Sequence, residues 1–333
     1  MFIYEVMDYD CVISGEGGLH MAKNAQPAAV GKKGSLWKQV YQQRGLYLLL
    51  LPGLIYLIVF KYFPMFGVII AFQNFSPFLG FFKSPWVGFE QFRLFFAGND
   101  FLVLMRNTLG ISILNLLFYF PAPIILALFL NEIKCSWYKR FAQTLVYIPH
   151  FISFVIVASL SYTLFNVNDG IIHEILQAIT GKSIDILSKP KYFWGLIVGQ
   201  SIWKECGYGT IVFLAALSGV DVQLYEAAKV DGAGRWRLMW HVTLPAIKST
   251  IVIMLIMRVG SILNTGYDQI FLMRNSINVS RAEVIDTYVY MRGVSGGQYS
   301  YSTAVGLFKS IVGMIMVISA DRLAKKMGES GLY

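Results

Sequence analysis

Long apolar stretches separated by polar connections dominate the chain. A helix needs about 20 largely apolar residues to cross the hydrocarbon core of a membrane, and six stretches reach or approach that length. Two contain no Asp, Glu, Lys or Arg, and the other four contain one or two such residues. The stretches cover residues 46–72, 108–130, 141–168, 192–220, 249–273 and 303–320. The pattern therefore predicts an all-α integral membrane protein with six transmembrane helices.

The composition supports the same class. Hydrophobic residues make up 56% of the 333 residues and charged residues only 14%, whereas an average soluble domain has about 45–50% and about 25%. The net charge of +9 is dispersed between the apolar stretches and forms no aromatic-interleaved patch, so we expect the lipid bilayer and no nucleic acid as a partner. The three cysteines lie far apart, without the spacing of a zinc site or a disulfide framework.

The distribution of Lys and Arg predicts the orientation. With the N-terminus inside, the inside segments carry 15 Lys and Arg and the outside segments carry eight. Positive residues are enriched in cytoplasmic connections. We therefore expect both termini to be cytoplasmic.

This orientation divides the chain into five parts. They are a cytoplasmic N-terminal tail (1–44), a first transmembrane helix (45–72), an extracellular connection with an aromatic segment (73–102), a core transmembrane domain (103–320) and a cytoplasmic C-terminal tail (321–333).

The first 20 residues differ from the rest, because they lack the apolar region of a signal peptide. Glu16, Gly17 and Gly18 are what a purine-rich ribosome-binding sequence encodes when it is read in frame, and Met21 follows closely. We therefore expect translation to start at Met21, with a disordered cytoplasmic tail as the alternative.

The connection between the fourth and fifth stretches, residues 221–247, carries the most informative pattern. Its first part is rich in good helix formers, Asp231 and Gly232 favour a tight turn, and Trp236 and Trp240 share one face of a following helix. The segment predicts a short helical hairpin that presses on another protein. A helix that lies among lipid headgroups is the alternative.

The same connection resembles the EAA loop of binding-protein-dependent ABC importer permeases of the type I fold. The matching residues are Glu226, Ala227, Ala228, Asp231, Gly232, Ala233, Leu244 and Pro245. Further matches to the oligosaccharide and polysaccharide branch of that family are residues 107–109, 203–205, 215–217 and 301–307. The resemblance covers residues 44–326.

The resemblance implies a division of labour. In this family the EAA loop docks into a groove of a cytoplasmic ATPase dimer, and Glu226 and Gly232 match the marked positions of the loop. A second permease subunit, which we expect to be a different chain, completes the pathway, and an extracellular solute-binding protein delivers the solute. The chain itself is expected to bind no cofactor, since ATP and Mg are used by the ATPase. We therefore expect a non-enzymatic, multi-pass subunit in a bacterial cell membrane.

Charged residues within the fourth stretch are candidates for the substrate pathway. A charged side chain in a membrane is costly, so it faces a partner or water. Lys204 and Glu205 are adjacent and so point about 100° apart on a helix, and we expect each to have its own partner. Trp203 could stack on a sugar ring while the Glu205 carboxylate accepts hydrogen bonds from hydroxyl groups. A structural ion pair with a neighbouring helix is the alternative.

A second candidate group lies near the outer end of the fifth stretch. Asn264, Tyr267, Asp268 and Gln269 combine an aromatic ring with hydrogen-bonding groups, and they resemble a similarly placed segment of the family. Packing against the sixth span or the binding protein is the alternative. Lys309, in the sixth stretch, is expected to extend its ammonium group to the outer surface.

The sequence thus predicts a permease subunit that forms half of the translocation pathway for an oligosaccharide or other carbohydrate. A permease of the same type for an amino acid, peptide or polyol is the first alternative. An ion-coupled secondary transporter that uses Glu205 or Asp268 is the second, but the inverted repeats that it predicts are not evident. A membrane enzyme is the third, although no nucleophile, base and metal cluster is assembled in the sequence.

Overall fold

The computed structural model describes residues 41, 43–329 and 331. The proposed start at Met21 and nearly all of the predicted N-terminal tail lie outside the described residues.

The chain divides into two compact units, residues 1–63 and 64–333. In the first unit, α2 (Arg44–Leu57) continues directly into the π-helical turn η1 (Ile58–Tyr62). Pro52 lies inside α2, yet the apolar run stays helical. The one-turn helix α3 (Phe63–Met65) crosses the boundary between the units.

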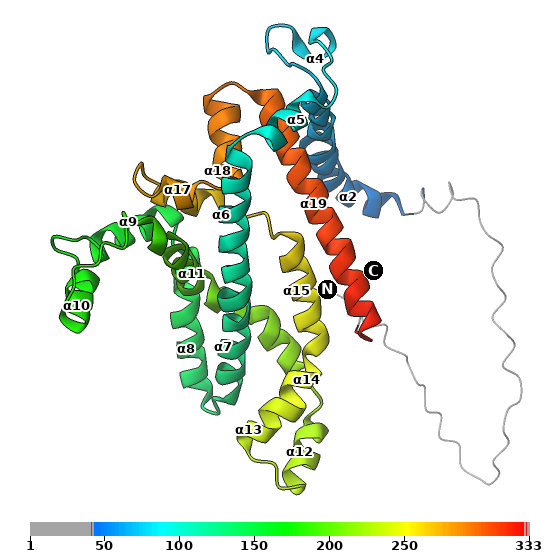
Figure 1. The fold of residues 1–333 in the computed structure, drawn as a ribbon. Helices are drawn as coiled ribbons and strands as arrows, with labels where there is room; N and C mark the ends of the chain where they lie inside the picture. Colours follow the sequence, from blue (N-terminus) through cyan, green and yellow to red (C-terminus); the bar gives the residue numbers. More distant parts are fainter. Residues whose placement is uncertain (1–40, 42, 330, 332–333) are drawn as a thin grey trace, which may run out of the picture. The chain divides into compact units, whose positions relative to one another are not determined.

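In the described part of the second unit, every regular element is a helix (Figure 1). In chain order these elements are η2 (Phe66–Phe72), α4 (Gly80–Lys83), α5 (Glu90–Ala97), α6 (Asp100–Leu114), η3 (Asn115–Tyr119), α7 (Pro121–Glu132), α8 (Ser136–Tyr147), η4 (Ile148–Phe151), α9 (Phe154–Leu164), α10 (Ile171–Thr180), α11 (Pro190–Ser218), α12 (Val222–Val230), α13 (Arg235–Leu238), η5 (Met239–Thr243), α14 (Leu244–Ala246), α15 (Lys248–Gly260), α16 (Tyr267–Met273), α17 (Val279–Ala282), α18 (Ile285–Tyr290), η6 (Met291–Ser295) and α19 (Tyr299–Lys326). An isolated antiparallel bridge joins Gln73 to Trp86. The predicted all-α class is confirmed for the described residues.

Among the described residues, between three and six segments are long and apolar enough to cross a membrane. Three are continuous helical stretches, Arg44–Phe72, Asp100–Glu132 and Tyr299–Lys326. Three more are pairs of helices that bend sharply at a short break, by 97° between α8–η4 and α9, 73° between α11 and α12, and 60° between α13–α14 and α15.

The fifth predicted span, residues 249–273, is wrong as a single helix. α15 ends at Gly260, and α16 begins only at Tyr267. Gly266, directly before α16, has a φ of +87°, a left-handed conformation that cannot be part of a continuous helix. The Ser261 hydroxyl also donates a hydrogen bond to the Arg258 carbonyl (3.1 Å), an alternative that Ser offers to the helical pattern. Asn264 therefore lies in the break and the other candidates of this group lie in α16.

The long helix α11 forms the centre of the second unit, where it packs against α6, α7, α8, α15 and α17. Glycines allow two of these close approaches. The ring of Trp194 on α11 fills the place that a Cβ on Gly110 of α6 would occupy. A Cβ on Gly207 of α11 would overlap the Val146 carbonyl of α8. These contacts bring α11 close to α6 near its start and close to α8 near its middle.

Candidate functional site

The loop that resembles the EAA motif is a helical hairpin with a defined turn. The Asp221 side chain caps α12 by accepting a hydrogen bond from the Gln223 amide (2.9 Å). At the other end of α12, the Ala233 amide donates a hydrogen bond to the Ala228 carbonyl (2.9 Å). The Gly232 amide donates a hydrogen bond to the Lys229 carbonyl (3.0 Å). This pair of bonds is a Schellman motif. It requires the left-handed conformation that Gly232 has, with a φ of +78°.

The hairpin presents most of its motif residues to the outside. Side chains at five of these positions are exposed and those at the other three are half-buried. The exposed ones are Glu226, Ala227, Asp231, Gly232 and Pro245, and the half-buried ones are Ala228, Ala233 and Leu244. Trp236 and Trp240 are also exposed, at 66% and 61%.

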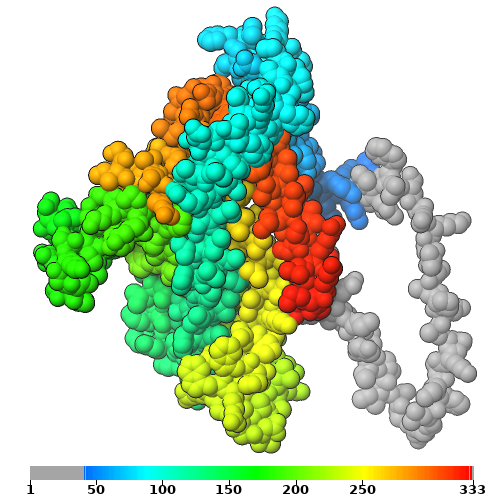
Figure 2. Space-filling model, viewed as in Figure 1, coloured from blue at the N-terminus to red at the C-terminus, as the bar shows by residue number. Residues whose placement is uncertain are grey.

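The hairpin lies at one end of the second unit. α12, α13 and α14 lie together at the lower end of the view in Figure 1, whereas α17 and α18 lie beside the upper part of α6. In the space-filling view the hairpin forms a separate lobe beyond the long helices (Figure 2). Such a projecting, exposed element with a fixed turn is suited to contact another protein.

A charged cluster lies halfway along α11. The Lys204 ammonium donates to Glu205 Oε1 and to the His150 carbonyl, both at 2.7 Å. Glu205 Oε2 lies 2.6 Å from His150 Nδ1, and the His150 ring stacks on Tyr208 with centroids 3.9 Å apart. The expectation that Lys204 and Glu205 each have a separate partner is therefore wrong. The two side chains pair with each other and both contact His150, because both are long enough to turn toward the same neighbour.

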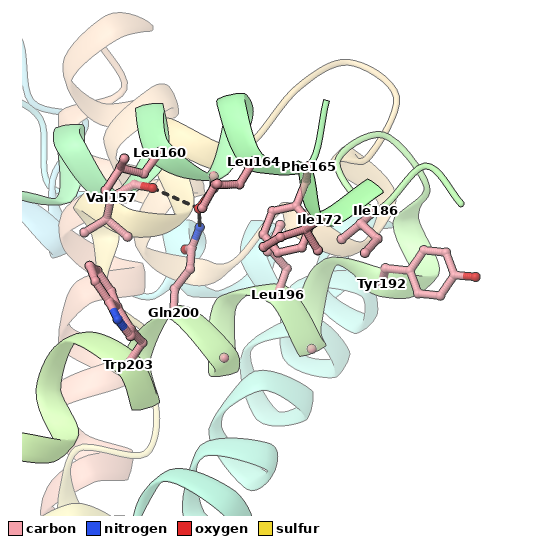
Figure 3. Close-up of a pocket in the computed structure, with 13 residues that line it drawn as sticks. Val157, Leu160, Leu164, Phe165, Ile172, Ile186, Tyr192, Leu196, Gln200 and Trp203 are labelled. Atoms are coloured by element: carbon pink, nitrogen blue, oxygen red, sulfur yellow. Dashed lines mark hydrogen bonds between the residues drawn. The ribbon is translucent and has the colours of Figure 1, made fainter. Parts of the chain in front are cut away.

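Trp203 borders a cavity of about 610 Å³ between α9, α10 and α11 (Figure 3). The cavity wall is mostly apolar, and the Trp203 side chain is 49% exposed. Gln200 also borders it, but its amide donates to Ser161 (2.7 Å), which in turn donates to the Val157 carbonyl (2.9 Å). Trp203 and Glu205 lie two residues apart on α11, and only Trp203 borders this cavity.

Gln269 of α16 is buried and belongs to the same hydrogen-bond network. Its amide nitrogen donates to Gln200 Oε1 (2.9 Å) and to the Ile197 carbonyl (2.8 Å), and its oxygen accepts from Ser201 (3.1 Å). The network joins α16, α11 and α9. In this arrangement the polar atoms of Gln269 are used for helix packing.

The remaining residues of the second candidate group are more accessible. Asn264 and Asp268 are exposed and Tyr267 is half-buried. The Tyr267 ring stacks on Phe271 with centroids 5.2 Å apart and lies 5.0 Å from Tyr290. The aromatic cluster of Tyr267, Phe271 and Tyr290 therefore lies close in sequence to two exposed polar groups, the Asn264 amide and the Asp268 carboxylate.

The expectation that Lys309 extends its ammonium group to the outer surface is wrong. Its ammonium pairs with the Asp286 carboxylate of α18, which also accepts a hydrogen bond from the Thr265 amide (3.2 Å). The ion pair therefore ties α19 to α18 and to the α15–α16 break.

Comparison with protein families identifies the chain. Residues 119–329 match the family described as binding-protein-dependent transport system inner membrane component. The chain belongs to this family. The match includes the hairpin, the charged cluster and the aromatic group.

Two curated relatives from Bacillus subtilis (strain 168) match this transport component over nearly their whole length. Protein LplB is 54% identical over 312 residues, which are 93% of this chain and 98% of the relative. The polygalacturonan/rhamnogalacturonan transport system permease protein YteP is 51% identical over 302 residues, which are 91% of this chain and 94% of the relative.

A solved structure resembles the transport component along most of its length. It is a crystal structure of a bacterial alginate ABC transporter in complex with a periplasmic protein that has bound an alginate pentasaccharide. The aligned chain is 37% identical, with a TM-score of 0.82, and the alignment covers 90% of this chain and 100% of that one. The chain therefore adopts the type I ABC permease fold.

Sequence reasoning did not identify every polar partner in this transport component. His150 and Ser161 lie in a stretch read as an uninterrupted apolar span, and Tyr208 follows Glu205 by three residues. The residue in the sequence that indicated an interruption of this span was Pro149, which lies in η4, between α8 and α9. A residue next to such a break has a carbonyl without a helical partner, and Lys204 supplies the donor.

Proposed function

We propose that this inner membrane component forms half of the translocation pathway of an ATP-driven importer for an oligosaccharide or polysaccharide fragment. The observation that carries the proposal is the exposed helical hairpin with its glycine-dependent turn in a member of the binding-protein-dependent transport family. The names of YteP and of the alginate transporter, each more than one third identical to this chain, support a carbohydrate as the solute.

The proposed topology has six spans and cytoplasmic termini. Each bent pair of helices counts as one span, and the excess of Lys and Arg on the hairpin side favours a cytoplasmic hairpin. On this topology residues 45–72 are the first span, 73–102 an extracellular connection and 103–320 the core domain.

The hairpin is proposed to couple transport to ATP hydrolysis in a separate cytoplasmic ATPase dimer. Glu226 is exposed on α12 and supplies a carboxylate for contact. Two main-chain hydrogen bonds hold the turn at Gly232, so the hairpin is proposed to move as one piece. ATP and Mg belong to the ATPase in this proposal, and a second permease, a different chain, completes the pathway.

Trp203, Glu205, Asn264, Tyr267 and Asp268 are proposed to contact the solute. Aromatic rings offer flat apolar faces that suit sugar rings, and the carboxylates and the amide can pair with hydroxyl groups. Gln269 is proposed to act indirectly, since its hydrogen bonds hold α16 against α11.

Affinity purification of the chain from its native membrane in mild detergent tests the proposal. The eluate is analysed by mass spectrometry and assayed for ATPase activity. We expect a nucleotide-binding subunit, a second permease and a solute-binding protein, whose ligand then names the solute. A chain that purifies alone and catalyses ion-coupled uptake in liposomes would overturn the proposal.

A further inference from the structure

The cavity of about 610 Å³ between α9, α10 and α11 has a wall that suits a hydrocarbon chain. Apart from the aromatic residues at its two ends, the polar side chains in the wall are Ser161 and Gln200. Both already bond within the protein, because Gln200 donates to Ser161 and Ser161 donates to the Val157 carbonyl. The rest of the wall is aliphatic, aromatic or glycine. The cavity therefore offers an apolar surface and few free hydrogen-bonding groups.

The cavity extends along α11 over the depth of one leaflet of a bilayer. Tyr192 and Trp203 lie at opposite ends of its labelled side chains (Figure 3). At about 1.5 Å per residue they are roughly 16 Å apart along the helix axis, which is about half of the 30 Å hydrocarbon core. Because the hairpin that follows α11 is proposed to be cytoplasmic, the Tyr192 end lies at the outer surface. The cavity therefore matches the outer leaflet in depth.

The outer end of the cavity carries positive charge. The Lys191 ammonium lies 4.6 Å from the centre of the Tyr192 ring, which lines this end. Lys189 lies two residues earlier, and both lysines are exposed. The first turn of α11 contains no acidic residue, and the nearby Asp185 carboxylate accepts a hydrogen bond from the Ser188 amide (2.9 Å). Two cations beside an apolar cavity are complementary to a lipid with an anionic headgroup.

The short helix α10 continues the apolar surface beyond the cavity. Ile172 lines the cavity, and Ile171, Ile175 and Ile179 are exposed on the neighbouring face of the helix. Gln177 lies on the opposite face. A helix with one apolar and one polar face lies in the plane of the membrane interface. We therefore expect α10 at the level of the lipid headgroups, beside the outer end of the cavity.

We infer that this cavity binds an acyl chain of an anionic phospholipid from the outer leaflet, with the phosphate group beside Lys189 and Lys191. The acyl chain lies along α11 and fills the space between α9 and α11, and its end contacts one face of the Trp203 indole. The other face remains for the proposed contact with the solute. The inference rests on the proposed topology of the importer subunit, which places the start of α11 outside.

Native mass spectrometry of the full chain with its co-purifying partners tests this inference. The complex is placed in nanodiscs with equal amounts of phosphatidylglycerol, which is anionic, and phosphatidylcholine, which has no net charge, both with the same acyl chains. It is then extracted into mild detergent, and wild type should retain phosphatidylglycerol in preference to phosphatidylcholine. Lys191→Gln should lower this preference about fivefold, the effect of one basic residue near an anionic lipid surface.

A second variant tests the cavity itself. Gly199 lines the cavity and is exposed, with nothing within 4 Å of its Cβ position. Gly199→Leu should therefore place its side chain in the cavity and abolish retention of both lipids. Gly53→Leu is the matched control, since Gly53 lies in α2, outside the cavity, and also has nothing within 4 Å. Lys83→Gln, at an exposed lysine of α4, is the control for charge, and both controls should behave as wild type.

Three results would overturn the inference: wild type retains neither lipid, wild type retains both lipids equally, or Gly199→Leu retains as much lipid as wild type. A helix of the second permease is another occupant for an apolar cavity. In that case wild type would retain no lipid and Gly199→Leu would lower recovery of the second permease, which also overturns the inference. The importer proposal stands apart from these results, since recovery of the ATPase and ATP-dependent uptake by wild type test it.

Discussion

The main chain of Gly232 has a φ of +78°, and two amide-to-carbonyl bonds around it close the turn of the hairpin. A residue with a Cβ is strained in this conformation by about 1–2 kcal/mol. The side chains of the turn take no part in these bonds. The shape of the turn therefore depends on the backbone conformation of Gly232.

Gly232→Ala should loosen the hairpin without affecting the rest of the fold. We expect faster hydrogen exchange at the Ala233 amide and less ATPase recovered with the purified chain. Gly234→Ala is the control, because Gly234 has a φ of −73° and open space around its Cβ position. Equal effects of the two substitutions would contradict the explanation.

Burial raises the pKa of Glu283 above its ordinary value of 4.5, although the Arg274 guanidinium and the Thr287 hydrogen bond oppose the shift and Asp100 adds to it. The folded protein therefore binds this proton more tightly than the unfolded chain does. Protonation of Glu283 contributes stability that is complete below pH 4.5 and is lost as the pH rises through the raised value.

Glu283→Gln should remove this part of the pH dependence. We expect the difference in unfolding temperature between variant and wild type to change between pH 4.5 and neutral pH, with wild type losing stability relative to the variant as the pH rises. Thermal unfolding of the detergent-purified protein measures it. A constant difference across this range would show that Glu283 does not titrate there.

Single residues also mark the limit of what sequence can predict. The helical angle between Lys204 and Glu205 suggested separate partners, but flexible side chains allow both to meet at His150. His150 is 54 residues away from Lys204 along the chain. Likewise, no local pattern pairs Lys309 with Asp286. Such contacts depend on how helices pack, which the hydrophobic pattern does not encode.

At the scale of elements, hydropathy predicted the positions of apolar segments better than their shapes. Residues 108–130 lie within one continuous helical span, as expected. Residues 141–168 contain no Asp, Glu, Lys or Arg, yet the path bends by 97° at the break between η4 and α9. Hydropathy is insensitive to this bend because apolar residues flank it on both sides. The hairpin was predicted better, since helix formers and a turn glycine specify it locally.

The packing of α8 on α11 gives a prediction for a whole element. Gly207→Ala should force the two helices apart, because its Cβ would overlap the Val146 carbonyl, and backbone cannot move aside as a side chain can. We expect a lower unfolding temperature and reduced uptake. Gly195→Ala on the same helix is the control, with nothing within 4 Å of its Cβ position. A stable Gly207→Ala protein would mean that α8 and α11 lie farther apart.

At the scale of the molecule, the second unit separates two kinds of contact. The hairpin at one end exposes carboxylate and aromatic groups. A cavity at the other end, beside the start of α6 and helices α17 and α18, is lined by charged groups of both signs, among them Glu283, Arg274 and Arg292. The helices α6–α7, α11 and α19 connect the two ends (Figure 1). The hairpin and this cavity therefore lie at opposite ends of one packed helical unit.

Glu226→Lys tests the link between the hairpin and the ATPase. Reversal of an exposed charge leaves the core untouched, so we expect normal insertion into the membrane. The ATPase should co-purify less and solute-stimulated ATP hydrolysis should fall. Membrane abundance of the variant is the control for insertion. Unchanged uptake with full ATPase recovery would exclude Glu226 from the contact.

The two hydrogen bonds that close the hairpin turn run between main-chain atoms of residues 228–233, and no side chain takes part in these two bonds. Substitutions at the exposed positions of this loop can therefore change its outer surface and leave the backbone conformation of the turn unchanged. Residues 221–247 behave as a module that could be exchanged between related permeases. A chimera carrying this module from a relative should inherit the preference for that relative's ATPase and keep its own solute.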